Sequence, residues 1–357
     1  MGHALDLPAG VRQLLAKGTV IPAHPLALTQ RRTLDRRHQR ALTRYYAAAG
    51  AGGVAVGVHT TQFQIREPSI NLLQPVLELA AETIDQMALA RPFIKVAGIV
   101  GPTAQAVSEA QLAKSLGYHL GLLSMGGLSN LDETALIERT RRIGEVIPVF
   151  GFYLQPAVGG RVLSRRFWEE VVEIPTLLAI KIAPFDRYRT LEVVRALAAS
   201  SRSSQVALYT GNDDHIVVDL LTPYRFWIDG RWVEQRIVGG LLGHWAVWTK
   251  RAVELFERVQ EIIGQENIPR NLLTEAAEIT AMNAILFDVA HNFQGSIAGI
   301  HEILYRQGLL AGTWCLDPED RLSPGQMEDI VGVMEQFESY RDDAFVAKHL
   351  ASWLDDG

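Results

Sequence analysis

The chain has 357 residues, 48% of them hydrophobic, so it can bury the core of one large barrel or of two ordinary domains. Its net charge of -6 gives no basic surface for nucleic acid, and the arginine-rich stretch 30–37 is interpreted as a solvated helix start. The single cysteine, Cys315, excludes an intramolecular disulfide and a thiolate metal site. Residues 1–17 do not resemble a secretion signal, and no apolar run approaches the ~18 residues of a membrane span. We therefore expect a cytoplasmic protein without membrane contact.

Eight short apolar runs alternate with helical patterns along the chain. The predicted strands are 19–23, 53–58, 94–100, 119–124, 148–153, 177–182, 205–210 and 238–243. The predicted helices are 35–49, 68–89, 103–116, 131–146, 164–172, 186–200, 212–221 and 245–263. Strands this apolar, in serial βα units, are typical of a closed barrel. The sequence therefore predicts an α/β fold, a (β/α)8 TIM barrel with a C-terminal helical extension.

A doubly wound sheet is the alternative fold, but its glycine-rich phosphate loop is missing. The glycine cluster 50–53 follows a helix and precedes a strand, so we interpret it as a helix stop. Asp229-Gly230 lies between aromatic arms and predicts a β-hairpin at about 225–236, inserted before the eighth strand. The predicted organisation is a barrel at 19–263 and about three helices at 264–357.

Lys181 stands alone in the apolar run 177–183, at the end of the sixth predicted strand. A buried charged amine is costly, so it needs a partner, a neutral state or a functional reason. Burial can lower a lysine pKa by about 3–5 units and leave a neutral amine that attacks a ketone at pH 7. Active sites of such barrels lie at the carboxyl ends of the strands. We predict that Lys181 forms a Schiff base; a lysine that simply reaches water is the alternative.

Strand alternation suggests a partner for this lysine. On the sixth strand Ala179 and Lys181 share one face. On the fifth strand Gly151 and Tyr153 share one face. We therefore expect Tyr153 to point into the barrel beside Lys181, where a phenol could relay protons. The alternative is a tyrosine whose hydroxyl has only a structural partner.

The second predicted strand ends in His59, Thr60 and Thr61. Adjacent threonines in a tight turn offer two hydroxyls and two backbone N–H groups, which suit a carboxylate that no arginine holds. His59 is assigned to the same substrate-binding group, together with Gly243 at the end of the eighth predicted strand.

In chain order these features resemble the dihydrodipicolinate synthase and N-acetylneuraminate lyase superfamily of pyruvate-dependent class I aldolases. The matching segments are Val20-Ile21-Pro22-Ala23, Gly50-Ala51-Gly52-Gly53-Val54, Thr60-Thr61, Tyr153-Leu154-Gln155-Pro156, Ile180-Lys181 and Gly211-Asn212-Asp213. The resemblance implies that Lys181 is the Schiff-base lysine and Tyr153 the proton relay. It also implies that Thr60 and Thr61 bind the carboxylate of a 2-oxo acid. A homo-oligomer, either a dimer or a tetramer, is expected by the same resemblance, without a cofactor or a bound metal.

Three departures from the family pattern limit what carries over. Gln62-Phe63 stands where the family usually has Gly-Glu. Val158 stands where synthases that use aspartate semialdehyde carry an arginine for the second substrate's carboxylate, and 125–127 (Met-Gly-Gly) replaces an aromatic pair. We therefore expect a bulkier or less charged aldehyde as the second substrate. His59 could supply the missing acid or base near neutral pH.

The main functional prediction is a Schiff-base class I lyase or aldolase that acts on pyruvate or a related 2-oxo acid together with an aldehyde. It would make or break a carbon–carbon bond or eliminate water. A 2-oxo acid sensor or a catalytically slow barrel is the alternative. A metal-dependent barrel hydrolase is a weaker one, because 23–26 reads Ala-His-Pro-Leu where those enzymes begin with a His-x-His pair. Histidines near strand ends are the ligands that such an enzyme would need, namely His24, His59, His215 and His244.

Overall fold

The structure, a computed structural model, describes residues 7–355. Eight parallel strands, each followed by a helical segment, define an α/β fold of the (β/α)8 barrel type with a C-terminal helical region, as the sequence predicts. Within these residues the chain divides into two compact units: unit 1 runs up to Thr19 and then covers Ile94–Leu241, and unit 2 covers Val20–Phe93 and continues from Leu242. The boundary expected at residue 264 stays a prediction. No helix within residues 7–355 is both long and apolar enough to span a membrane.

Unit 1 carries six of the barrel strands, which pair in parallel in the order β3, β4, β5, β6, β7, β10. Its strands are β3 (Ile94–Ile99), β4 (Leu120–Leu123), β5 (Val149–Leu154), β6 (Leu177–Ala183), β7 (Ala207–Thr210), β8 (Tyr224–Ile228), β9 (Arg231–Gln235) and β10 (Ile237–Leu242). Its helices are α1 (Ala9–Lys17), α4 (Thr103–Ser115), α5 (Glu133–Gly144), η3 (Pro156–Val158), α6 (Arg165–Val171), α7 (Arg187–Ala199) and α8 (Ile216–Leu221). The barrel strands among them are almost entirely buried, which explains why they read as continuous apolar runs.

The pairing of β5 with β6 is irregular at one point. Val149 pairs with Leu177, but the next residue of β5, Phe150, pairs with Ala179, so Leu178 is an extra residue on β6. Such a bulge changes which side chains of the two strands share a face. Leu178 is half-buried and lines a cavity of about 340 Å³ at the amino-terminal ends of β6 and β7.

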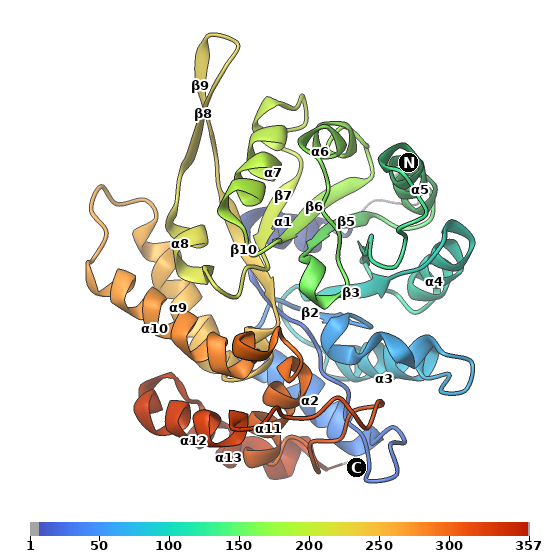
Figure 1. Ribbon diagram of the computed structural model, residues 1–357, viewed down its shortest axis with the longest axis vertical. Helices are drawn as coiled ribbons and strands as arrows, with labels where there is room; N and C mark the ends of the chain where they lie inside the picture. The colour runs from blue at the N-terminus through green and yellow to red at the C-terminus, as the bar shows by residue number, and fades with distance from the viewer. Residues whose placement is uncertain (1–6, 356–357) are drawn as a thin grey trace. The chain divides into compact units, whose positions relative to one another are not determined.

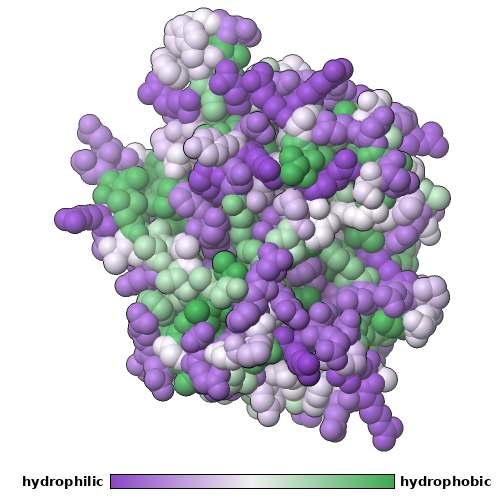
Figure 2. Space-filling view, viewed as in Figure 1, coloured by the Kyte–Doolittle hydropathy of each residue, from purple (hydrophilic) through white to green (hydrophobic). Residues whose placement is uncertain are grey.

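The β-hairpin expected at 225–236 is formed by β8 and β9, which pair antiparallel. Asp229 and Gly230 both have left-handed backbone angles (φ 48° and 78°), as a two-residue turn of this kind requires. The hairpin projects beyond α7 and α8 (Figure 1), and its surface is largely intermediate to hydrophilic (Figure 2). Trp227 and Trp232 contact each other on its exposed face, with ring centroids 5.4 Å apart.

Unit 2 contains the first two barrel strands and the C-terminal helices. Its elements are β1 (Val20–Pro22), α2 (Arg36–Ala49), β2 (Gly53–Val56), η1 (His59–Thr61), η2 (Phe63–Arg66), α3 (Leu73–Gln86), η4 (His244–Ala246), α9 (Thr249–Ile262), α10 (Asn271–Leu286), η5 (Val289–His291), α11 (Ser296–Arg306), α12 (Gln326–Gln336), η6 (Glu338–Tyr340) and α13 (Asp343–Trp353). β1 lies beside β2, because Gly52 N donates to Val20 O (3.0 Å) and His24 N donates to Ala55 O (2.8 Å).

Four α-helices follow α9 in the described residues, where the sequence suggested about three. The buried carboxylate of Asp342 fastens the last of them. It accepts hydrogen bonds from the Tyr45 hydroxyl (2.7 Å), Gln307 Nε2 (2.9 Å) and Lys250 N (3.0 Å). Because these donors come from α2, α9 and the end of α11, the carboxylate joins the start of α13 to the rest of unit 2, where α13 packs on α2.

Candidate functional site

Lys181 lies near the carboxyl end of β6 and is 8% exposed. Its Nζ stands 4.6 Å from the ring centroid of Phe152. The stem of the lysine passes Gly211, just beyond β7, where a Cβ would come within 2.5 Å of Lys181 Cε. Glycine at position 211 therefore leaves the space that the lysine occupies.

Burial lowers the pKa of the Lys181 amine to about 8, and the negative charge of Asp213 opposes this lowering. With a pKa of about 8, roughly one amine in ten is neutral at pH 7. The neutral form is the nucleophile in imine formation. The position of Lys181 and the direction of its pKa therefore both suit the predicted chemistry.

The expectation that Tyr153 shares a face with Lys181 is wrong. Lys181 pairs in register with Phe152, whereas Tyr153 pairs with Ile182 on the opposite face. The ring of Tyr153 packs against Trp168 of α6, with centroids 5.3 Å apart.

The polar partners of Tyr153 are also on the helix side. Its hydroxyl donates to Leu163 O and accepts from Leu163 N, both at 3.3 Å. Burial raises the pKa of this phenol. A tyrosine held in this way supports the segment before α6 and leaves the face of β5 beside Lys181 to Phe152.

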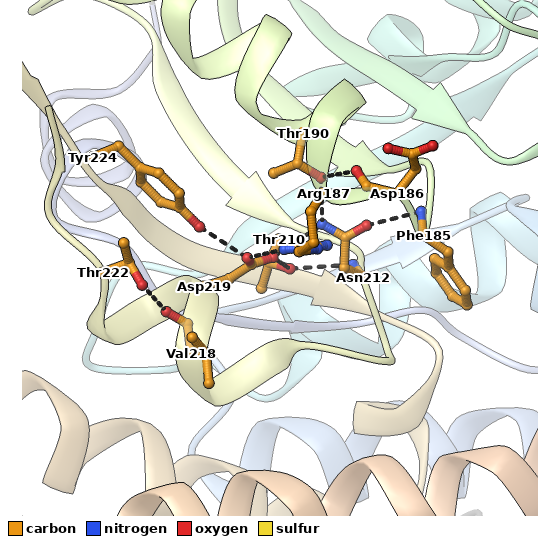
Figure 3. Close-up of polar contacts among 10 residues, drawn as sticks. All are labelled: Phe185, Asp186, Arg187, Thr190, Thr210, Asn212, Val218, Asp219, Thr222 and Tyr224. Carbon is orange, nitrogen blue, oxygen red and sulfur yellow. Dashed lines mark hydrogen bonds and ion pairs between the residues drawn. The ribbon is translucent and has the colours of Figure 1, made fainter. Parts of the chain in front are cut away.

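A network centred on Asp219 holds the segment that follows β7 (Figure 3). The Asp219 carboxylate is fully buried and receives four bonds. The donors are Arg187 Nη1 (2.6 Å), Thr210 Oγ1 (2.7 Å), Asn212 Nδ2 (2.9 Å) and the Tyr224 hydroxyl (2.9 Å). These donors belong to α7, β7, the following loop and β8, so one carboxylate joins four segments of unit 1.

Asn212 extends this network to the end of β6. Its Oδ1 accepts from Phe185 N (3.1 Å), and its own N–H donates to Thr210 Oγ1 (3.1 Å). Both residues that flank Gly211 are therefore fixed by side-chain bonds. The loop carries Asp213, which is buried at 8% exposure, directly after Asn212.

In unit 2, Thr60 and Thr61 lie in the turn η1 after β2, as predicted, and are buried. The hydroxyl of Thr61 links the turn to the segment after β1. It accepts from Gly57 N (3.0 Å) and Val58 N (3.2 Å) and donates to His24 O (2.7 Å). Thr60 Oγ1 donates to the same carbonyl over 3.3 Å, a longer and weaker bond.

Gln62 ends this turn with φ at 67°, the left-handed region that glycine occupies most easily. The residue is fully buried, and its Oε1 accepts from Leu316 N (2.6 Å). The side chain of Gln62 thus fastens the turn to the segment after α11. This bond accounts for a glutamine at a position where a glycine is expected from the resemblance.

The other two predicted binding residues also lie in unit 2. His59 is half-buried, and its ring centroid is 6.0 Å from that of Phe63. Gly243 is half-buried at the start of η4, where its carbonyl accepts from Ala246 N (3.0 Å).

The loops after β4 and β5 are closely packed against each other. A Cβ on Gly126 would lie 2.3 Å from Gly159 O, so this contact needs glycine. Arg161 Nη1 donates to Leu128 O (2.9 Å) and Leu131 O (3.0 Å). The arginine of this loop is therefore engaged by backbone carbonyls.

The histidines considered as metal ligands have other environments. His24 is fully buried, with Nδ1 2.7 Å from Pro25 O and Nε2 2.8 Å from Thr43 Oγ1, and burial lowers its pKa to about 4. Burial also lowers the pKa of His244 to about 4. Across residues 7–355, no three His, Cys, Asp or Glu side chains converge as a metal ion would require.

Known proteins resemble this chain in structure. A scan against protein-family models and a search of curated proteins found no match. The dihydrodipicolinate synthase of Oceanobacillus iheyensis is similar with a TM-score of 0.73 and 18% identity, over 92% of this chain and 99% of that protein. YagE of E. coli K12 is a prophage protein of the dihydrodipicolinic acid synthase family solved with pyruvate. It is similar with a TM-score of 0.72 and 14% identity, over 90% of this chain and 98% of that protein. CdNal of Clostridium difficile, solved with mannosamine, is similar with a TM-score of 0.69 and 15% identity, over 90% of this chain and 99% of that protein.

These matches define the class of fold: the chain has the barrel of the dihydrodipicolinate synthase and N-acetylneuraminate lyase structures along nearly its whole length. The resemblance inferred from the sequence is thereby confirmed for the fold. Sequence reasoning missed the orientation of Phe152 and the part played by Asp219. An aspartate within the short apolar helix 216–221 was the signal for Asp219, because a charge in such a segment needs buried partners.

Proposed function

We propose that this protein is a Schiff-base-forming class I lyase or aldolase that acts on pyruvate or a related 2-oxo acid. The observation that carries the proposal is Lys181: a buried lysine at the carboxyl end of a barrel strand, with its pKa lowered to about 8. The likeness in fold to dihydrodipicolinate synthases supports the same reaction class. Burial against Phe152 gives the amine a weakly solvated environment in which its neutral form is favoured.

In the proposed reaction, neutral Lys181 Nζ attacks C2 of the 2-oxo acid. Loss of water gives an iminium ion, and loss of a proton from C3 gives an enamine. The enamine carbon then attacks an aldehyde, or the reverse reaction releases one. We assign carboxylate binding to the η1 turn, with the Thr60 hydroxyl as the exchangeable donor and Thr61 as the residue that keeps the turn in shape. His59 and Gly243 stay proposed contacts of the substrate.

The second substrate is proposed to be an aldehyde without a carboxylate. Val158 offers no cation, and Arg161 is already bonded to the carbonyls of Leu128 and Leu131. A site without a free arginine lacks the bidentate bonds that make carboxylate recognition strong. Aspartate semialdehyde is therefore expected to have a lower kcat/KM than neutral aldehydes in a panel tested with pyruvate. The opposite ranking would contradict this assignment.

Borohydride trapping tests the reaction class. Incubation with pyruvate and sodium borohydride should add one reduced pyruvyl group to the intact protein, and peptide mapping should place it on Lys181. Lys95 is the matched control, because it too is buried but its Nζ lies near Gly117, between α4 and β4. A wild-type protein without an adduct, or with one on Lys95, would rule out the proposed function.

A sensor that binds a 2-oxo acid is the second candidate, and the orientation of Tyr153 is the observation that favours it. A barrel that has lost its proton-relay tyrosine keeps the imine but turns over slowly. Borohydride trapping does not distinguish the enzyme from the sensor, because both form the imine. Exchange of the pyruvate methyl protons with D2O is therefore the deciding measurement. Adduct formation without exchange would favour the sensor, whereas catalysed exchange shows that the enamine forms.

A further inference from the structure

Lys181 needs a group that moves protons, and Tyr153 is turned toward Trp168 instead. Imine formation removes a proton from the ammonium and later delivers one to the departing hydroxyl. The neighbour on β5 is Phe152, whose ring neither accepts nor donates such protons. The residue of β5 beside Lys181 therefore supplies no proton-transfer group, and the other strand that pairs with β6 is β7.

The segment after β7 meets the lysine directly. Lys181 Cε occupies the space above Gly211, where a Cβ would be 2.5 Å away. Two residues later comes Asp213, a buried carboxylate. Its charge acts on the Lys181 ammonium. Unlike a phenylalanine, a carboxylate can accept a proton and return it.

The Asp219 network explains why this loop is fixed. Thr210 and Asn212, on either side of Gly211, both donate to the same Asp219 oxygen, at 2.7 and 2.9 Å (Figure 3). Arg187 and the Tyr224 hydroxyl occupy the other oxygen, at 2.6 and 2.9 Å. With its lone pairs filled, the Asp219 carboxylate is a structural anchor.

We infer that Asp213 is the proton-transfer partner of Lys181 in place of a tyrosine, and that Asp219 is the residue that positions it. The inference rests on the proposed function, because it concerns the same imine. It assigns to the loop 211–213 a chemical role, and it makes the β8 strand of the hairpin, through Tyr224, part of the support of that loop.

The proton steps balance without any further reactant. The Asp213 carboxylate takes a proton from the Lys181 ammonium, which leaves a neutral amine and a carboxylic acid. The amine nitrogen bonds to C2 of the 2-oxo acid, and a proton moves from nitrogen to the former carbonyl oxygen, which gives a neutral carbinolamine. The Asp213 acid then protonates this hydroxyl, the C2–O bond breaks and water leaves. The products are an iminium ion, water and the original carboxylate.

The test compares two neighbouring carboxylates in the full-length protein. Methyl exchange of pyruvate in D2O is followed by NMR for the wild type, Asp213→Asn and the control Asp214→Asn. Loss of a positioned proton-transfer group slows a reaction by about 10²-fold or more, so we expect this loss for Asp213→Asn. Asp214→Asn is the matched control, because it makes the same change of side chain at the adjacent residue. Its exchange rate should stay within about threefold of wild type, since Asp214 has no part in the proposed proton transfer.

Rescue by a small acid separates chemistry from folding. Asp213→Ala should be slow, and formate should restore part of the exchange rate, because a free carboxylate can enter the space of the lost one. A slow Asp213→Ala that formate does not accelerate would overturn the inference, as would an Asp213→Asn rate within about threefold of wild type. A wild type that neither exchanges nor traps pyruvate would instead reject the proposed function itself.

The positioning role of Asp219 has its own readout. Asp219→Asn keeps the size of the side chain but weakens its bonds to Thr210 and Asn212. We expect kcat for exchange to fall while KM for pyruvate changes little. The variant disturbs the loop that carries the proton-transfer group, whereas the carboxylate of pyruvate is assigned to the η1 turn. Equal changes in both constants, or none, would contradict this role.

Discussion

Two groups of residues are assigned to one reaction, and they are built in different ways. At Lys181 and the loop after β7 the structure places charges: the lysine, Asp213, and the buried Asp219 that pairs with Arg187. Around Thr61 it places neutral hydrogen bonds, two within the turn and one to the carbonyl of His24 after β1. Charges in a buried site respond to proton movement, whereas neutral bonds of this kind fix geometry. We therefore expect proton transfer at the ends of β6 and β7, and we expect η1 to fix the geometry of binding.

The largest effect should come from removing the lysine. Lys181→Met is expected to abolish the pyruvate adduct completely and still fold, because it removes a charge from an apolar site. Intact-mass analysis after borohydride treatment measures the first effect. A variant that still forms an adduct would show that another amine reacts.

The same variant tests the lysine pKa. Burial lowers it from 10.5 to about 8, so the unfolded chain binds more protons between these two pH values and wild-type stability rises with pH there. Below pH 8 the buried ammonium of the wild type lowers its free energy of unfolding by the full amount, about 3 kcal/mol. Lys181→Met should therefore be more stable than wild type at pH 7, and the gap should shrink toward pH 10. Denaturant unfolding at both pH values measures this, and a constant gap would contradict the lowered pKa.

The next largest effect is expected at Asp219. Asp219→Ala leaves the buried Thr210 and Asn212 and the half-buried Arg187 and Tyr224 without this acceptor. Each buried polar group left unsatisfied costs about 1–3 kcal/mol of unfolding free energy, and the ion pair adds less because the Arg187 side chain is 35% exposed. Urea unfolding measures the loss. An Asp219→Ala protein as stable as wild type would mean that the network is not formed in solution.

Tyr153→Phe should have a smaller effect on activity than the family resemblance implies. The resemblance implies a loss of about 10²-fold, whereas within residues 7–355 the hydroxyl is hydrogen-bonded to the backbone of Leu163 alone. We expect methyl exchange within about threefold of wild type and a stability loss of about 1 kcal/mol from the missing bond. If Tyr153→Phe exchanged the methyl protons a hundredfold more slowly than wild type, Tyr153 would be the proton relay after all.

The smallest effects should separate the two threonines. Thr61→Val removes the acceptor of two buried N–H groups, so it is expected to cost about 1–3 kcal/mol of stability. Thr60→Val should change stability little and raise KM for pyruvate, because it removes the exchangeable donor. Unfolding curves and exchange kinetics of the pair measure both quantities. Reversed roles would show that Thr61 meets the substrate.

The eight strands could be predicted from the sequence because each is an apolar run bounded by helical patterns. The same argument found Lys181, since a single charge in such a run stands out. The orientation of Tyr153 could not be predicted. Alternation from Val149 and Leu177 would pair Tyr153 with Lys181, but the extra residue Leu178 moves the register by one and brings Phe152 there instead.

The hairpin and the Asp219 network show the same limit from another side. The hairpin followed from Asp229-Gly230, because a two-residue turn has a local signature. The four donors to Asp219 come from separate segments, so no local pattern announces them. Local rules predict elements, and contacts between distant segments need the fold.

The most direct test of the central claim is a crystal structure of the protein after reduction with borohydride in the presence of pyruvate. It should show a covalent bond from Lys181 Nζ to C2 of the former pyruvate and the Asp213 carboxylate within hydrogen-bond distance of that nitrogen. Tyr153 should keep its bonds to Leu163. An adduct that receives its hydrogen bond from Tyr153, or one attached to another lysine, would contradict the account.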